Sequence, residues 1–183
     1  MREFTALLTP CNIELIAGPP GFVTPEDAGT FVGNAKQKAH ALLALRPDAT
    51  GVLADDSGLE VQALGGEPGV LSARYAGDLG DTANCVKLLG ALAAVPPGQR
   101  QARMVCAIVC ARRGRPDEVF LGELRGAIAL APAGAHGFGY DPIFVPEGHT
   151  QTLAELTPAE KNAISHRAHA LRLLVARLGT SPK

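Results

Sequence analysis

The stretch Leu53-Ala-Asp-Asp-Ser-Gly-Leu-Glu-Val61 decides the fold of this chain. Apolar residues lead into two adjacent carboxylates, Asp55 and Asp56, and resume after Ser57-Gly58. This pattern predicts a buried strand over 51–56 that ends in a sharp turn with the acids at its tip, and a second strand over 59–64. In an α/β fold, ligands bind at the carboxyl ends of strands. The acids are therefore site residues or ordinary turn residues, and an Asp-Asp pair alone favours the turn.

The two acids are not expected to act together. Because neighbouring residues of a regular strand point to opposite faces, Asp55 and Asp56 could share one ion only where the strand has broken. The simpler expectation is that one carboxylate faces a site while the other caps the turn.

Composition indicates one ordinary globular domain over 1–183. The 183 residues are 46% hydrophobic and carry a formal net charge of −1, which gives no general attraction to nucleic acid or to an anionic membrane. No stretch resembles a signal peptide or a membrane span, and the four cysteines form no CxxC motif. We expect a soluble, cytoplasmic protein with structural thiols that binds neither nucleic acid nor membranes.

Hydrophobic periodicity predicts alternating helices and strands along the rest of the chain. We expect helices over 1–8, from Thr30 onward and over 81–92, and strands over 12–17, 104–111 and 119–128. The last two strands are expected to form an antiparallel hairpin, with 104–111 central in the sheet. The buried stripe of the second helix is predicted to be Val32, Ala35, Ala39, Leu42 and Leu43, with Asn34, Lys38 and His40 off it. For the third helix we expect a cap at Asp81 and inward-facing Val86, Leu89 and Leu92.

Two polar regions remain, and each has two interpretations. The stretch 134–144 is glycine-dense and carries aromatic residues, so it is either a close approach of backbone to a ligand or simply a tight loop. Thr157-Pro-Ala-Glu160 has capping-box spacing and predicts a helix start, and Ser165 could cap a further helix. Lys161, His166 and Arg167 then suit a phosphate or a polar base edge, or else form a solvated helix face.

Four stretches together resemble the inosine triphosphate pyrophosphatase-like family. They are TFVGNAKQKA (30–39), LADDSGLEVQALGGEPGVLSARYAG (53–77), FGYDPIF (138–144) and AELTPAEKNAISHRAHAL (154–171). The resemblance implies an α/β fold in which helices flank an elongated mixed β-sheet, with two lobes and the active cleft between them. It also implies a homodimer that hydrolyses ITP, dITP and XTP to the monophosphate and pyrophosphate with Mg²⁺, and thereby cleanses the nucleotide pool.

The resemblance assigns expected roles to particular residues. Asp56 matches the catalytic carboxylate, which also ligates the metal, and Glu26 is the best match for a second metal ligand. Residues that match substrate contacts are Ser57, Phe138, Gly139, Tyr140, Asp141, Lys161, His166 and Arg167. The chemistry is consistent with these roles, since carboxylates recruit Mg²⁺ and cations stabilise a pyrophosphate leaving group. Phe138 could stack on a purine, while Arg167, His166 or loop amides could read its 6-keto oxygen.

One departure from the family concerns the amino-terminal end. Family members begin with a strand and a phosphate-binding loop that carries a Lys, whereas Met1-Arg-Glu-Phe4 matches the helix that follows. We expect a misassigned start codon, with a truncated and weakened product as the alternative. Two hypotheses for function compete with this one: a non-catalytic nucleotide-binding protein, and a phosphatase or pyrophosphatase with a different nucleotide preference.

Overall fold

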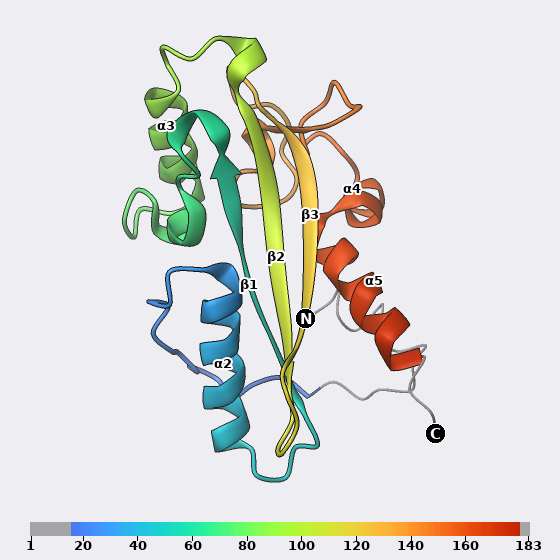
Figure 1. Cartoon of the computed structure of the whole chain (residues 1–183). Coiled ribbons are helices and arrows are strands. Elements are labelled where there is room, and N and C mark those ends of the chain that lie inside the picture. Colours follow the sequence, from blue (N-terminus) through green and yellow to red (C-terminus); the bar gives the residue numbers. More distant parts are fainter. Residues whose placement is uncertain (1–15, 180–183) are drawn as a thin grey trace. The chain divides into compact units, whose positions relative to one another are not determined.

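The computed structural model describes residues 16–179. In chain order, its helices and strands are α2 (Phe31–Leu45), β1 (Val52–Val61), α3 (Asp81–Ala91), β2 (Gln101–Ala111), β3 (Glu118–Ile128), β4 (Phe144–Pro146), α4 (Pro158–Ile164) and α5 (His166–Gly179). The strands form one sheet in the order β1-β2-β3-β4 (Figure 1). The predicted α/β fold with helices flanking a sheet is confirmed. The predicted helix over 1–8 and most of the predicted strand over 12–17 lie outside the described residues.

Contacts within the chain divide the described residues into two compact units. Unit 1 comprises residues 16–56, 106–122 and 167–179, and unit 2 comprises residues 57–105 and 123–166. Strands β1, β2 and β3 each contribute residues to both units. The single domain over 1–183 and the active cleft between two lobes stay predictions.

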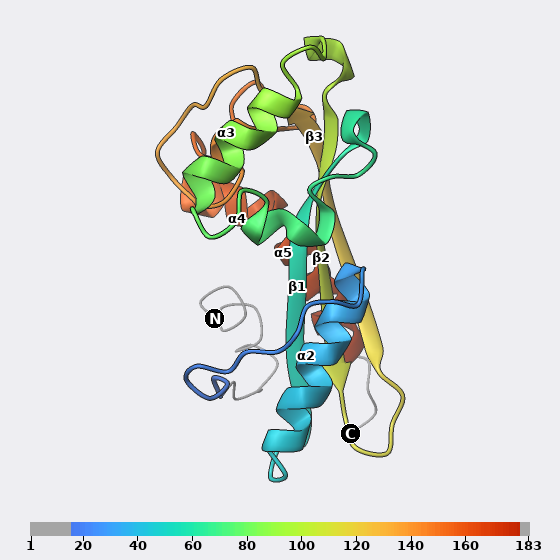
Figure 2. The ribbon, with the colours of Figure 1, turned by 90° about the vertical axis from the view of Figure 1, so that its left-hand side faces the viewer.

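Unit 1 is a three-layer arrangement in which α2 and α5 cover opposite faces of the strands. Figure 2 shows α2 in front of the strands and α5 behind them. Strand alternation explains the arrangement, because Cys106, Ile108 and Cys110 of β2 pack with Leu171 and Leu174 of α5 on one face. The intervening residues of β2 are also buried, so this strand is central, as predicted from its unbroken apolar run.

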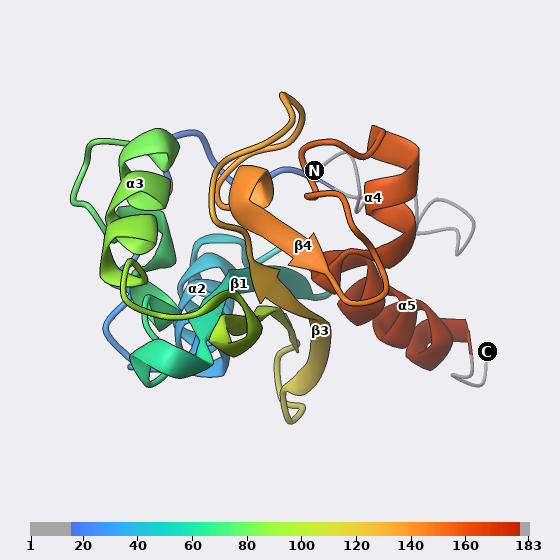
Figure 3. The same ribbon diagram turned by 90° about the horizontal axis from the view of Figure 1, so that it is seen from above.

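The core of unit 2 lies between the sheet and α3, with the segment after β3 completing it. Its largest fully buried side chains include Leu59, Leu88, Ile143 and Phe144. Each of these contributes about 1.5–3 kcal/mol by leaving water. Strand β4 pairs antiparallel with β3 (Figure 3), and Gly126 permits this close pairing because an added Cβ would meet the Phe144 ring at 2.8 Å.

The predicted helix starts at Thr30 and Thr157 are confirmed. The Thr30 hydroxyl accepts a hydrogen bond from the Gly33 amide at 3.0 Å, which caps α2. Thr157 and Glu160 form a reciprocal capping box at the start of α4. The predicted break at Ser165 is also present, so α5 begins at His166. Each cap satisfies amide groups that the first helical turn cannot.

The predicted turn at the acidic stretch is wrong. Strand β1 runs without interruption from Val52 to Val61, through both acids and through Ser57-Gly58. Asp-Asp-Ser-Gly is a turn signal only in isolation. Here, both carboxylates find cationic partners while the backbone stays extended, so Asp55 caps no turn. The two acids nevertheless point to opposite faces of the strand, since the Asp56 side chain contacts α2 and the Asp55 side chain contacts α5.

Two predicted helix faces also need correction. Asn34 was placed off the buried stripe of α2, yet it is fully buried because its amide is hydrogen-bonded at both ends. In α3, Val86 is exposed and the buried residues are Asn84, Cys85 and Leu88, whereas Leu92, directly after the helix, is buried as predicted. Asp81 is the first residue of α3, after the cap position at Gly80. Asn34 departs from the amphipathic pattern because its hydrogen-bond partners, the Ala28 amide and the Asp56 carboxylate, lie elsewhere in the chain.

Candidate functional site

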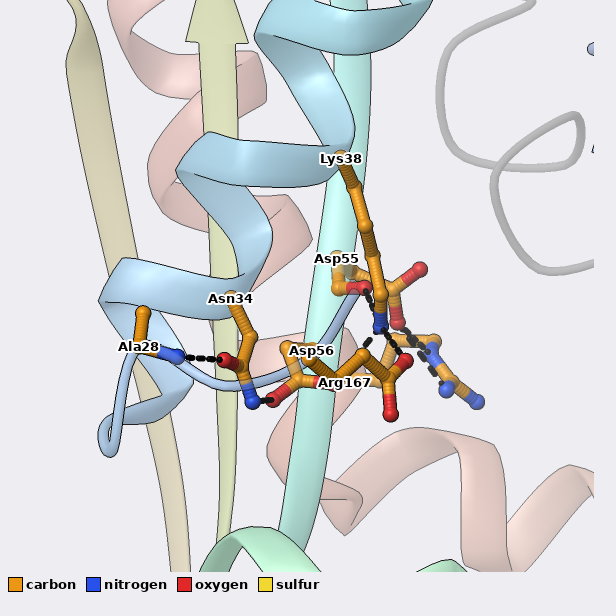
Figure 4. A network of polar contacts seen from close by, with 7 residues as sticks. Ala28, Asn34, Lys38, Asp55, Asp56 and Arg167 are labelled. Atoms are coloured by element: carbon orange, nitrogen blue, oxygen red, sulfur yellow. Dashed lines mark hydrogen bonds and ion pairs between the residues drawn. The ribbon is translucent and has the colours of Figure 1, made fainter. Parts of the chain in front are cut away.

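The acids of β1 contribute to a polar cluster in unit 1. Strand alternation directs Asp56 toward α2 and Asp55 toward α5 (Figure 4). Asp56 contacts Asn34 and Lys38, which lie one turn apart on α2. Adjacent carboxylates thus have separate partners, and each can serve a different purpose. We call the residues Glu26, Asn34, Lys38, Asp55, Asp56 and Arg167 the acidic cluster.

Lys38 lies at the centre of the acidic cluster. Its ammonium nitrogen is 2.6 Å from Glu26 Oε1 and 2.7 Å from Asp56 Oδ1, and it also donates to the Asp55 carbonyl at 3.3 Å. Burial alone would lower the pKa of Lys38, but the hydrogen bonds and charges of Asp56 and Glu26 outweigh burial and raise the pKa above its ordinary value. Three hard oxygen atoms therefore surround one positive charge.

Asn34 fixes the orientation of Asp56. Its Nδ2 donates to Asp56 Oδ2 at 3.1 Å, and its Oδ1 accepts from the Ala28 amide at 3.1 Å. Because Asn34 is 0% exposed, both bonds form away from water, where leaving them unmade would be costly. The same amide thereby connects Asp56 with the segment that carries Glu26.

Arg167 binds the other carboxylate of the acidic cluster. Its Nε and one terminal nitrogen both donate to Asp55 Oδ2, at 3.2 and 3.1 Å. The side chain is 23% exposed. A guanidinium that approaches one carboxylate oxygen through two nitrogens is held in a defined orientation. The predicted site residues Glu26, Asp56 and Arg167 are thus brought together within unit 1.

Two predicted residues next to these in sequence, Ser57 after Asp56 and His166 before Arg167, belong to unit 2. The Ser57 hydroxyl is buried and has no hydrogen-bond partner among residues 16–179. Buried hydroxyl groups in proteins almost always have a partner, so an unpaired one marks a position where a polar ligand group could bind. His166 is half-buried at the first position of α5.

The other predicted residues gather in a second cluster, which lies within unit 2. The Asp141 carboxylate accepts from the Phe138 amide at 2.8 Å and pairs with Lys161. The Lys161 ammonium also lies over the Phe138 ring, 4.4 Å from its centroid. Asp141 and Lys161 are buried, whereas Phe138 is 60% exposed. We call Phe138, Gly139, Tyr140, Asp141 and Lys161 the loop cluster.

Within the loop cluster, several polar groups are already engaged by the protein itself. The Tyr140 hydroxyl donates to the Ser72 carbonyl at 2.9 Å, and burial raises the pKa of this phenol. The amides of Phe138, Gly139 and Asp141 donate to protein oxygens. These bonds define the loop conformation. The Phe138 ring, in contrast, is exposed and available for contact with a ligand. Reading of a 6-keto oxygen by loop amides stays a prediction.

Two residues of the acidic cluster, Asn34 and Lys38, were missed as site residues by sequence reasoning. The sequence placed them off the apolar stripe of their helix, which alone describes a solvated face. The available signal was their spacing, since residues four apart on a helix lie on the same face. Only the fold shows that this face is covered by the strand that carries Asp56.

Comparison with known proteins assigns the family. The Ham1 family profile matches residues 1–177. The chain belongs to the Ham1 family. It is 46% identical over 181 residues to the dITP/XTP pyrophosphatase of Lactiplantibacillus plantarum, covering 96% of this chain and 88% of that protein. It is 49% identical over 178 residues to the dITP/XTP pyrophosphatase of Geobacillus kaustophilus, covering 95% and 86%.

Solved structures agree with this assignment to the Ham1 family. A HAM1 protein from Coxiella burnetii superposes with a TM-score of 0.89 at 39% identity, covering 98% of this chain and 93% of that one. The Ham1 protein of Staphylococcus aureus gives a TM-score of 0.88 at 40% identity, covering 97% and 92%. The resemblance drawn from the sequence motifs is therefore confirmed. Within residues 16–179, no helix is long and apolar enough to cross a membrane.

Proposed function

We propose that this chain is a nucleoside-triphosphate pyrophosphatase that hydrolyses the non-standard purine nucleotides dITP, XTP and ITP to the monophosphate and pyrophosphate. Relatives that carry the name dITP/XTP pyrophosphatase, at 46–51% identity over most of the chain, support this substrate class. The same names favour hydrolysis over the alternative of a non-catalytic nucleotide-binding protein.

The observation that carries the proposal is the arrangement of oxygens around Lys38. Glu26 and Asp56 come from separate segments, yet their carboxylates lie within 2.7 Å of the same ammonium nitrogen. Lys38 stands in for a cation that has hard oxygen ligands. Among residues 16–179, no group of three or more His, Cys, Asp or Glu side chains could hold a metal. This donor set fits Mg²⁺, which proteins commonly bind through one or two carboxylates while it keeps several waters.

In this proposal, Glu26 and Asp56 hold the metal ion. Bound Mg²⁺ would neutralise phosphate oxygens and lower the pKa of a coordinated water. Asp56 accepts the proton of the attacking water, and Asn34 keeps its carboxylate in one orientation for this role. The cationic side chains Lys38 and Arg167 offset the negative charge that develops on the leaving pyrophosphate.

The loop cluster is proposed to bind the base. The Phe138 ring offers an exposed apolar face on which a purine can stack, and Lys161 limits the ring's freedom from one side. Stacking of a base on an aromatic side chain contributes roughly 1–3 kcal/mol. Ser57 and His166 are proposed as further substrate contacts, in line with the unpaired hydroxyl of Ser57.

The test is pyrophosphate release from ITP, dITP, XTP, GTP, ATP and dUTP at equal concentration, with Mg²⁺ or with EDTA. We expect release from the first three nucleotides, and only with Mg²⁺. The variant Asp56→Asn should lower kcat roughly 10²–10⁴-fold, the usual contribution of a general base. Asp48→Asn is the matched control, because this exposed acid in the same unit pairs with the neighbouring Arg46 and forms no hydrogen bond or ion pair with the acidic cluster among residues 16–179. ITP binding without turnover would instead support the non-catalytic alternative.

Two further expectations accompany this proposal. A homodimer and a cytoplasmic location are properties that the family resemblance implies. Sedimentation equilibrium of the purified chain would test the first, since a dimer has twice the mass of a chain of 18.9 kDa. Fractionation of cells that express the natural gene would test the second.

A further inference from the structure

Two side chains of α3 hold both backbone polar groups of Gly139, its amide and its carbonyl. Asp81 Oδ2 accepts from the Gly139 amide at 2.6 Å, and Cys85 Sγ donates to the Gly139 carbonyl at 3.3 Å. Asp81 and Cys85 lie four residues apart, so they project from the same face of α3. Neither was among the predicted site residues, and the proposed function assigns a role to neither.

We propose that Asp81 and Cys85 are positioning residues for the nucleobase, which fix the loop that presents Phe138. This inference rests on the proposed function, because it assumes that the loop cluster binds the base. The two residues themselves need not touch the substrate. They determine where the Phe138 ring stands when a purine arrives.

The argument begins with the exposure of Phe138. Its ring is 60% exposed, so burial in the core does not hold it in place. Its position therefore depends on the backbone of residues 138–139, together with the Lys161 ammonium that lies over the ring. Gly139 adopts a φ of +60°, in the left-handed region, where glycine has little steric preference for one conformation over others. A loop with that freedom needs external bonds to keep one conformation.

The bonds from α3 meet that need because they act on both sides of the residue. A bond to the amide alone, or to the carbonyl alone, would fix one of the two peptide planes that flank Gly139 and leave the other free to rotate. With Asp81 on one side and Cys85 on the other, both flanking peptide planes are oriented. Asp141 adds a third restraint through the Phe138 amide.

The protonation of Cys85 suits a donor role. Burial raises the pKa of this thiol to about 11, and the charges of Asp81 and Asp141 act in the same direction. At neutral pH the S–H group is therefore intact and can donate to the Gly139 carbonyl. A thiolate could only repel that oxygen. The S–H group is a weak donor, so we expect Asp81 to contribute more of the restraint.

Loosening the loop should affect binding of the base and leave the phosphate chemistry intact. Asp81→Ala should raise KM for ITP roughly tenfold, the loss expected for one charge-assisted hydrogen bond, with kcat within about twofold of wild type. Cys85→Ala should raise KM about two- to threefold. The inhibition constant of inosine should rise in parallel, whereas that of pyrophosphate should stay at the wild-type value.

Conservative variants separate this role from a general effect on the helix. Asp81 is the first residue of α3, where its charge also favours the helix N-terminus. Asp81→Asn removes the charge but keeps an oxygen that can accept from the Gly139 amide, so its KM should lie close to wild type. Cys85→Ser keeps a donor and should rescue most of the loss in Cys85→Ala. Val86→Ala, at an exposed position of the same helix, is the control.

The inference is overturned if Asp81→Ala leaves KM unchanged while hydrogen exchange shows that the Gly139 amide has lost its protection. It is equally overturned if Asp81→Asn is as impaired as Asp81→Ala, or if pyrophosphate and inosine binding weaken together. A wild-type chain that turns over no ITP would refute the proposed function alone. In that case inosine binding to wild type, and its weakening in Asp81→Ala, still decides the inference.

Discussion

Replacing Lys38 by Met should destabilise the protein and make its stability depend on Mg²⁺. Methionine retains the apolar stem of lysine, so packing along α2 is largely kept. What disappears is the positive charge between Glu26 and Asp56. Two carboxylates that each lay within 2.7 Å of that charge would then face each other without compensation.

The magnitude follows from the burial of the three side chains. Removing one partner from a fully buried ion pair costs about 3–5 kcal/mol, whereas an exposed pair contributes about 0–1 kcal/mol. Lys38, Glu26 and Asp56 are 22%, 27% and 11% exposed, which places the cluster between these limits. We therefore expect a loss of about 1–2 kcal/mol in the free energy of unfolding, or roughly 2–8 °C in Tm for a chain of this size.

Thermal unfolding with and without Mg²⁺ measures both effects. If Mg²⁺ binds Glu26 and Asp56 as proposed, it competes in the wild type with the Lys38 ammonium for the same oxygens. In Lys38→Met that competitor is gone, so a given Mg²⁺ concentration should raise Tm further than in the wild type. His40→Ala is the control, because His40 lies on the same helix and pairs with Asp117 at an exposed position. Its Tm should change little, and its response to Mg²⁺ should equal that of the wild type.

Two results would refute this reasoning. A Lys38→Met variant as stable as wild type would mean that Lys38 offsets no repulsion between the carboxylates. An equal Mg²⁺ shift in the variant and the wild type would mean that Mg²⁺ and Lys38 do not share ligands. The second result would also remove the main support for the metal site proposed at Glu26 and Asp56.

Three further predictions test separate parts of the molecule. Because Lys38 has a raised pKa, its stabilisation is fully present below pH 10.5 and is lost at higher pH, so the stability difference between wild type and Lys38→Met should shrink there in urea titrations. Asn34→Leu should lower kcat at least tenfold and lower the free energy of unfolding by about 1–3 kcal/mol, since Asp56 and the Ala28 amide lose a buried partner. Steady-state kinetics would check the first effect, and an unfolding curve the second. Arg100→Met should cost about 3 kcal/mol in urea unfolding but leave KM unchanged, because this buried guanidinium binds three carbonyl oxygens of unit 2.

Features that depend on local sequence were predictable. Thr30 and Thr157 predict the starts of their helices, because a capping side chain bonds to amides within the first turn. The apolar run from Met104 to Ala111 predicts a central strand, because a strand that is buried on both faces is apolar at every position. Interactions within one short segment determine these caps and this strand, so the sequence of that segment is enough to predict them.

Features that depend on distant partners were not predictable. The stretch Asp55-Asp56-Ser57-Gly58 has turn composition, yet Lys38 and Arg167 stabilise its carboxylates in an extended strand. In the same way, Asn34 has the composition of a surface residue but is buried by its bonds to Ala28 and Asp56. In both cases tertiary partners override local preference, which is common at functional positions.

The extended strand has a consequence that a turn would not have. In a turn, the carboxylates of Asp55 and Asp56 could approach each other, and their like charges would repel. In β1 they point to opposite faces, and each pairs with its own cation, Lys38 or Arg167. The two carboxylates can therefore act independently. One carboxylate contributes to a group of oxygens around the Lys38 ammonium, while its neighbour holds the Arg167 guanidinium on the other face, so the two adjacent acids position two different cations. In the proposed function, the strand geometry, more than the acid pair itself, would suit this stretch to a triphosphate and its metal ion.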